Sequence, residues 1–142
     1  YTYTHPRPAV TVDCLIFSPS GQSTWLLLIQ RDKPPFEGSW ALPGGFVEIN
    51  EPLETAAHRE LEEETGIRDI RLQQFHTFGQ PGRDPRGRTI SVVYSGFMDH
   101  NSQQAMAGSD ARNARWFDIV HLPELAFDHH EIIHLAIKKM EL

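Results

Sequence analysis

The chain has 142 residues, 39% of them hydrophobic, which predicts one domain over residues 1–142 that buries about two-thirds of its unfolded surface. Its formal net charge of −6 argues against DNA or another polyanion as partner. The longest apolar run, Trp25 to Ile29, is far too short to cross a membrane. Because the single cysteine, Cys14, cannot form an intramolecular disulfide and lies in an apolar run, we expect a buried thiol and a cytoplasmic location.

The first third of the sequence predicts an extended arm followed by a β-hairpin. Residues 1–8 contain two prolines and should be extended. Ala9 to Phe17 and Thr24 to Gln30 have the β-branched and apolar composition of strands, and a turn-rich segment, residues 18–23, separates them. A loop over residues 31–39 should follow, with Trp40 packing the loop that comes after it.

A short strand over Phe46 to Glu48 should lead into a helix at about Pro52 to Thr65. Proline is suited to the first helical turn, and Gly66 is a stop signal. The helical spacing produces an apolar stripe made of Leu53, Ala56, Ala57 and Leu61.

Three carboxylates share one face of this predicted helix. Glu60, Glu63 and Glu64 are three or four positions apart or adjacent, so they fall within an arc of about 100°. Their mutual repulsion is relieved when a cation lies between them, and hard oxygen donors are suited to Mg²⁺ or Mn²⁺. Gly44 and Gly45, just before the helix, allow the backbone to approach a ligand closely, and a carbonyl there could complete the metal shell. An acidic helix face alone is otherwise an ordinary solvated surface.

The whole pattern resembles the Nudix box of the Nudix hydrolases at every defined position. It consists of Gly45, Glu51, Arg59-Glu60-Leu61, Glu63-Glu64 and Gly66-Ile67. The resemblance implies an α/β fold, a Nudix-type α/β/α sandwich with a mixed β-sheet between helices. It also implies hydrolysis of the diphosphate in a nucleoside diphosphate linked to another group.

The resemblance further implies roles for individual residues. Glu60, Glu63, Glu64 and the Gly44 carbonyl would hold Mg²⁺ or Mn²⁺, while Arg59 and Glu51 would form a pair that braces the helix. Cations bridging the diphosphate would neutralise the charge that grows in the transition state and activate a water. The water-activating base is expected to be Asp110, in a later loop, or Glu63. We count Glu63, Glu64 and Asp110 as candidate catalytic residues.

Downstream of the box, the sequence predicts a strand over Ile70 to Phe78 and a central strand over Thr89 to Met98. The loop between them carries Arg83, Arg86 and Arg88, which are either a phosphate clamp or part of a solvated hairpin turn.

The remaining segments complete the predicted domain. Residues 99–110 are small and polar, and we expect a mobile loop there; Ala114 to Ile119 should be the last strand. An amphipathic helix over Asp128 to Leu142, capped by Asp128, should close the domain.

The segment from His130 to His134 matches the HExxH zinc pattern. Only eight residues follow His134, however, and a catalytic zinc site needs a third protein ligand. We therefore interpret this segment as part of the closing helix, with Ile132, Ile133, Leu135 and Ala136 packed on the sheet.

Pro81, fifteen residues after Gly66, and the segments 108–117 and 125–129 are similar to bacterial ADP-ribose pyrophosphatases. That resemblance implies a small-molecule nucleotide substrate, ADP-ribose, cleaved to AMP and ribose 5-phosphate, with Phe127 or Phe36 stacking on adenine. Two alternatives stay open: a nucleoside triphosphate pyrophosphohydrolase, and a domain that senses ADP-ribose without turnover. A homodimer is an expectation at the level of the family.

Overall fold

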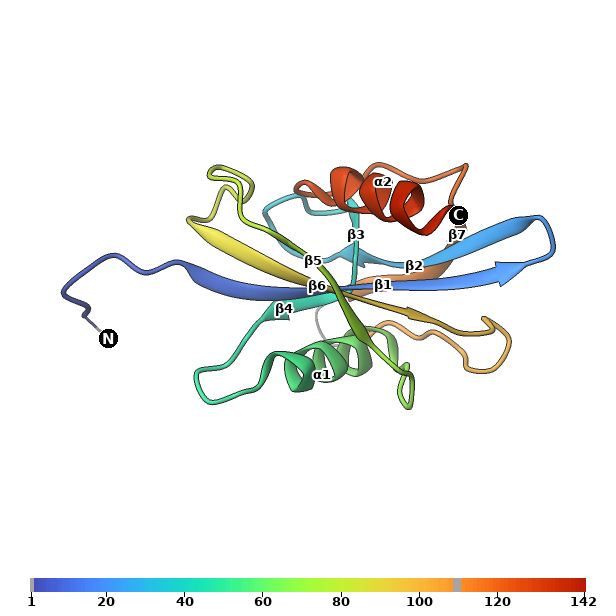
Figure 1. The fold of residues 1–142 in the computed structure, drawn as a ribbon, viewed down its shortest axis with the longest axis horizontal. Helices are drawn as coiled ribbons and strands as arrows, with labels where there is room; N and C mark the ends of the chain where they lie inside the picture. The colour runs from blue at the N-terminus through green and yellow to red at the C-terminus, as the bar shows by residue number, and fades with distance from the viewer. Residues whose placement is uncertain (1, 109–110) are drawn as a thin grey trace.

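The computed structural model describes residues 2–108 and 111–142, and in Figure 1 a β-sheet lies between helix α2 above and helix α1 below. The elements of the described residues are β1 (Ala9–Ser20), β2 (Ser23–Arg31), β3 (Trp40–Ala41), β4 (Gly44–Phe46), α1 (Leu53–Thr65), β5 (Gln73–Phe78), β6 (Thr89–Phe97), β7 (Ala111–Asp118) and α2 (His129–Met140). This arrangement confirms the predicted α/β/α sandwich.

The sheet is mixed and is built around β1. The strand order is β3-β2-β1-β6-β5, with β4 paired to β1 and β7 paired to β2. The predicted hairpin of β1 and β2 is present at the end of β1, where Phe17 lies opposite Leu26. β6 runs parallel to β1 over nine residue pairs and pairs with β5 on its other side, which confirms it as a central strand.

The two helices cover opposite faces of the sheet. Residues of β1 alternate between them: Cys14 and Ile16 belong to the core next to Leu61 of α1, whereas Leu15 and Phe17 belong to the core next to Ile132 of α2. A strand covered on both faces is expected to be apolar throughout, as most of β1 is. Cys14 is fully buried and its Sγ donates to the Ala57 carbonyl at 3.5 Å, which confirms the interpretation of a buried strand residue.

Several boundaries differ from those that the sequence predicts. The short strand predicted over Phe46 to Glu48 is instead β4, Gly44–Phe46, because Gly44 and Gly45 are the residues that pair with Asp13 and Val12 of β1. Trp40–Ala41, directly after the predicted loop, is a short strand paired with β2 that the sequence did not predict. β5 begins at Gln73 rather than Ile70, and β7 begins at Ala111. Pairing partners decide these ends, and local composition does not reveal them.

Both helices end in left-handed residues, and their beginnings differ. α1 follows Pro52 and stops at Gly66, whose φ of 75° suits glycine. Asp128 precedes α2 but makes no side-chain capping bond, so its predicted capping role is wrong. Its carboxylate accepts two hydrogen bonds from Arg83 instead, at 2.8 and 2.6 Å.

In the described residues, neither helix has the length and apolar character needed to cross a membrane.

Candidate active site

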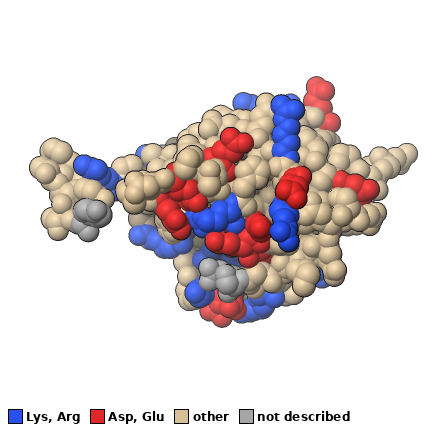
Figure 2. Space-filling model, turned by 90° about the horizontal axis from the view of Figure 1, so that it is seen from below, with Lys and Arg blue, Asp and Glu red and all other residues tan. Residues whose placement is uncertain are grey.

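A cleft of about 600 Å³ lies between the acidic face of α1 and the loop before β6. Its lining includes three acidic residues of α1, Glu60, Glu63 and Glu64, together with Arg83, Arg86 and Phe127. Figure 2, which shows the molecule from the α1 side, shows acidic and basic side chains interspersed over that face. The cleft therefore offers groups of both signs to one ligand.

Two of the three glutamates lie against the glycine loop. The backbone N–H of Gly44 donates to Oε1 of Glu64 at 2.7 Å, and Glu64 is only 9% exposed. A Cβ on Gly45 would be 2.5 Å from the Glu60 carboxylate, so this carboxylate lies directly against the glycine backbone. Glu63, with a side chain 51% exposed, lies nearer the solvent. The structure thus brings together the four residues predicted to hold a metal.

Arg59 connects these acids to the segment before the helix. Its Nε and Nη2 donate to the Glu51 carboxylate at 2.6 and 2.9 Å, and its Nη1 donates to Glu60 at 2.7 Å and Glu63 at 3.2 Å. The hydrogen bond with Arg59 lowers the pKa of Glu51, and that bond also raises the pKa of Arg59. Arg59 therefore supplies positive charge beside Glu60 and Glu63.

The donor set fits a partly hydrated divalent cation. Within residues 2–108 and 111–142, no three acidic, histidine or cysteine side chains form a ready-made metal cage, and Glu60 and Glu63 face Arg59. Mg²⁺ does not need a closed cage, since it keeps several waters and binds proteins through one or two carboxylates. Carboxylate and carbonyl oxygens at the edge of a cleft satisfy that requirement.

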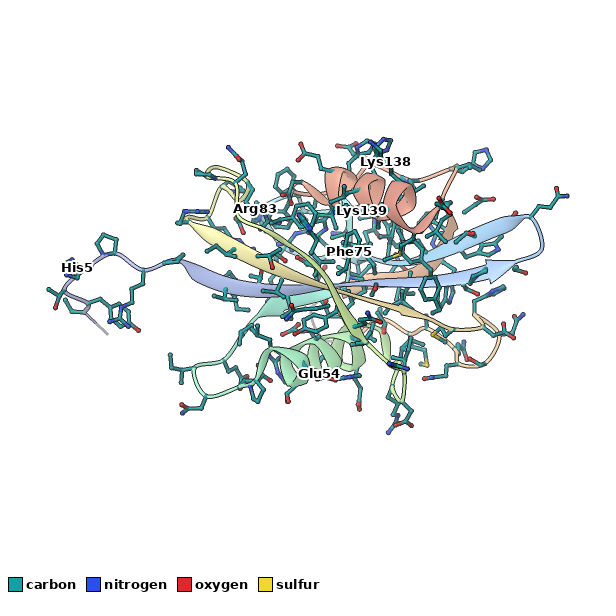
Figure 3. The ribbon with its side chains drawn as sticks, in the orientation of Figure 1. His5, Glu54, Phe75, Arg83, Lys138 and Lys139 are labelled. Atoms are coloured by element: carbon teal, nitrogen blue, oxygen red, sulfur yellow. The ribbon has the colours of Figure 1, made fainter. Side chains whose placement is uncertain are left out.

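The three arginines of the loop before β6 occupy three different environments. Arg83 is nearly buried and pairs with Asp128 at the start of α2. Figure 3 labels Arg83 on the side of the sheet that α2 covers. Arg86 pairs with Asp84, and its guanidinium lies 4.8 Å from the Phe46 ring centroid and 5.1 Å from that of Phe127. Arg88 is exposed and does not line the cleft.

The buried carboxylate of Asp84 anchors this loop. Burial alone would raise the pKa of Asp84, but its hydrogen bonds from Arg86 outweigh that effect and lower it. A buried side chain therefore holds this loop in place.

The two aromatic residues expected to stack on adenine, Phe127 and Phe36, lie in different environments. Phe127 is half-buried and lines the cleft, whereas Phe36 packs edge-on against it with ring centroids 5.0 Å apart and does not line the cleft. Trp40 packs edge-on against Phe117 of β7, with ring centroids 4.7 Å apart. Asp110, the candidate base, lies outside the described residues.

Arg31, Asp13 and His129 are three of the cleft residues that sequence reasoning missed. Arg31 places its guanidinium 4.9 Å from the Phe127 ring centroid, and burial followed by the charge of Arg86 lowers its pKa. Asp13 and His129 are buried polar residues that also line the cleft. Asp13 could have been noticed as a charge inside an apolar strand, whereas no local signal distinguishes Arg31 or His129.

The HExxH segment has no metal-site geometry in the structure. His130 and His134 are exposed on α2 with parallel rings 6.1 Å apart, and the described residues provide no third ligand there. Ile132, Ile133 and Ala136 are buried as predicted, while Leu135 is only half-buried.

The chain belongs to the NUDIX domain family, whose pattern matches residues 7–136. It is 44% identical over 127 residues to an ADP-ribose pyrophosphatase of Methanocaldococcus jannaschii, covering 89% of this chain and 72% of that protein. It is also 36% identical over 140 residues to the ADPR responsive transcriptional repressor NtrR of Acinetobacter baylyi, covering 96% of this chain but only 56% of the repressor.

Solved structures agree with the sequence matches. The NUDIX domain of Shewanella oneidensis NrtR, solved in complex with ADP ribose, superposes with a TM-score of 0.87 at 32% identity and covers 96% of this chain and 90% of that one. A bifunctional NMN adenylyltransferase/ADP ribose pyrophosphatase from Francisella tularensis, solved with AMP and a Mn ion, gives 0.80 at 30% identity and covers 96% of this chain and 43% of that one.

Proposed function

We propose that this chain hydrolyses the diphosphate of ADP-ribose to give AMP and ribose 5-phosphate, with Mg²⁺ or Mn²⁺ as cofactor. The observation that carries the proposal is the placement of Glu60 and Glu64 against the Gly44–Gly45 loop, in a cleft that arginines and Phe127 also line. The match to an ADP-ribose pyrophosphatase supports the choice of substrate.

The acidic residues of the cleft would bind the metal and the reacting water. Glu60, Glu64, Glu63 and the Gly44 carbonyl would hold the divalent cations, which when bound neutralise charge on the diphosphate and lower the pKa of a water. The water oxygen forms a bond to phosphorus, the P–O bond to the bridging oxygen breaks, and that oxygen leaves on the second phosphate. Glu63, exposed at the rim, or Asp110 would accept the proton of the water.

The arginines and Phe127 of the cleft would bind the rest of the nucleotide. Phe127 presents a half-buried ring on which adenine could stack. Arg86 and Arg31 lie at that ring and would bind phosphate oxygens through their guanidinium groups. Arg83 would act mainly by holding the loop on α2, and Arg88 would contact only a part of the substrate that extends beyond the cleft.

Release of AMP from ADP-ribose with Mg²⁺ tests the proposal. Glu64→Gln should lower kcat by about 100-fold with little change in thermal stability, because it removes a charge from the cation site. Glu62→Gln is the matched control, since Glu62 is exposed and does not line the cleft. A Glu64→Gln variant as active as the wild type would refute the metal assignment.

The second candidate is an ADP-ribose sensor, which the similarity to the NrtR domain supports. A sensor would bind ADP-ribose and release no AMP with any divalent metal. The same assay run with nucleoside triphosphates tests the third alternative, a triphosphate pyrophosphohydrolase.

A further inference from the structure

His129, the first residue of α2, contacts the segment between β3 and β4, directly before Gly44. It is 4% exposed, and its Nδ1 accepts a hydrogen bond from the backbone N–H of Leu42 at 3.0 Å. A ring nitrogen that accepts carries no proton, so the proton of the neutral ring is on Nε2. Nε2 lies 3.6 Å from Oδ1 of Asp13, which is an electrostatic contact rather than a hydrogen bond.

Asp13 in turn lies directly beside Gly44. The two residues are opposite each other in the β1–β4 ladder, and a Cβ on Gly44 would be 2.5 Å from Asp13 Oδ1 and 2.1 Å from the Val12 carbonyl. The other oxygen of Asp13 accepts a hydrogen bond from Ser91 Oγ at 2.5 Å, so β6 fixes the orientation of the carboxylate.

The segment from Leu42 to Gly44 is thus held from three sides. α2 holds it through His129, β1 through the bond from the Cys14 N–H to the Pro43 carbonyl at 2.8 Å, and α1 through the bond from the Gly44 N–H to Glu64. Burying a carboxylate and an imidazole in a sheet core is costly, whereas apolar side chains would fill the same space without that cost. Their presence at the floor of the cleft therefore needs a role other than packing.

We propose that His129, which lies beside Asp13, is a positioning residue that holds the Leu42–Gly44 segment so that the Gly44 carbonyl oxygen faces the cation site. The inference rests on the proposed function, because it takes that carbonyl to be a metal ligand. Outer partners of metal ligands commonly change metal affinity by about 10- to 100-fold when they are removed.

The test measures Mn²⁺ affinity by calorimetry or electron paramagnetic resonance, without substrate. His129→Leu removes the acceptor of the Leu42 N–H and should weaken Mn²⁺ binding by about 10-fold or more. His129→Asn places an oxygen near the position of Nδ1 and should keep an affinity close to that of the wild type. His130→Leu is the matched control, since His130 is the exposed neighbour on the same helix, and it should change nothing.

A second measurement separates positioning from a general loss of fold. With saturating ADP-ribose, the Mg²⁺ concentration needed for half-maximal rate should rise for His129→Leu, while KM for ADP-ribose stays near the wild-type value. A folded His129→Leu variant with wild-type Mn²⁺ affinity overturns the inference. If that variant does not fold, His129→Asn decides: wild-type affinity supports the inference, and a 10-fold loss overturns it.

These measurements distinguish failure of the proposed function from failure of the inference about His129. Wild-type protein that binds Mn²⁺ but releases no AMP refutes the hydrolase assignment, while the affinities of the two variants still decide the role of His129. Wild-type protein that does not bind Mn²⁺ refutes both.

Discussion

Burial makes His129 a residue whose protonation state depends on the fold. Burial lowers its pKa below the ordinary value of 6.5; Asp13 and Asp128 oppose this shift, and Arg83 and Arg31 add to it. A protonated Nδ1 could not accept the Leu42 N–H, so the neutral ring is the form that is compatible with the observed contact.

This residue makes stability depend on pH in a definite direction. As pH falls below 6.5, His129 of the unfolded chain gains a proton before that of the folded chain does, so the free energy of unfolding should fall. We expect this loss to continue until the folded pKa is passed. Urea unfolding between about pH 7.5 and pH 5.5 measures it, and the slope should be shallower in His129→Asn. Equal slopes in the variant and the wild type would contradict the assignment.

At the scale of elements, helix α1 depends on a segment of the loop after β6. The N–H groups of Met106 and Gly108 donate to the carbonyls of Thr65 and Glu64, at 2.8 and 3.1 Å. These carbonyls belong to the last turn of α1, where no N–H group of the helix itself is available to donate to them. The loop predicted to be mobile over residues 99–110 is therefore attached to α1 at residues 106 and 108, directly behind the acidic face.

Gly108 allows this close approach. A Cβ at this position would be 1.5 Å from the Glu63 carbonyl oxygen, so Gly108→Ala should push the segment off the helix and destabilise the protein by about 1–3 kcal/mol. Gly79→Ala is the control, because its Cβ would meet only Ile90 at 3.8 Å and should cost less than about 0.5 kcal/mol. Urea unfolding compares them, and similar values would show that the loop contact contributes nothing.

At the scale of the whole molecule, the cleft depends on both helix layers. Glu64 comes from α1 below the sheet and His129 from α2 above it, and both bind the segment between β3 and β4. Both layers can reach this segment because β1 changes its pairing partner along its length. Thr11 to Asp13 of β1 pair with β4, whereas only Phe17 to Ser20 pair with β2, so β2 does not pair with β1 beside Asp13.

The ion pair of Arg83 and Asp128 joins the loop before β6 to α2 across 45 residues of sequence. The side chains are 5% and 13% exposed, so Arg83→Met leaves a buried carboxylate unpaired and should destabilise the protein by about 3–5 kcal/mol. Adding Asp128→Asn should recover part of that loss. Denaturant unfolding of the single and double variants measures both effects.

A surface pair provides the comparison for that experiment. Arg112 and Glu37 are 3.4 Å apart with side chains 44% and 53% exposed, so Glu37→Gln should cost less than about 1 kcal/mol. An Arg83→Met variant no less stable than Glu37→Gln would mean that the buried pair does not hold the loop on α2.

The sequence by itself determined the features that depend on near neighbours. The period of α1, its stop at Gly66 and the shared face of Glu60, Glu63 and Glu64 follow from helical geometry within one segment. The alternation of β6 and the hairpin of β1 and β2 follow from strand periodicity and a turn of a few residues.

Only the tertiary structure decided which distant groups meet. It excluded Arg88 from the cleft, brought Arg31 to Phe127, and joined Asp13 to His129 over more than a hundred residues of sequence. It also showed that Asp128, predicted to cap α2, pairs with Arg83 instead. Such contacts depend on how strands pair and layers pack, and no local pattern of residues contains that information.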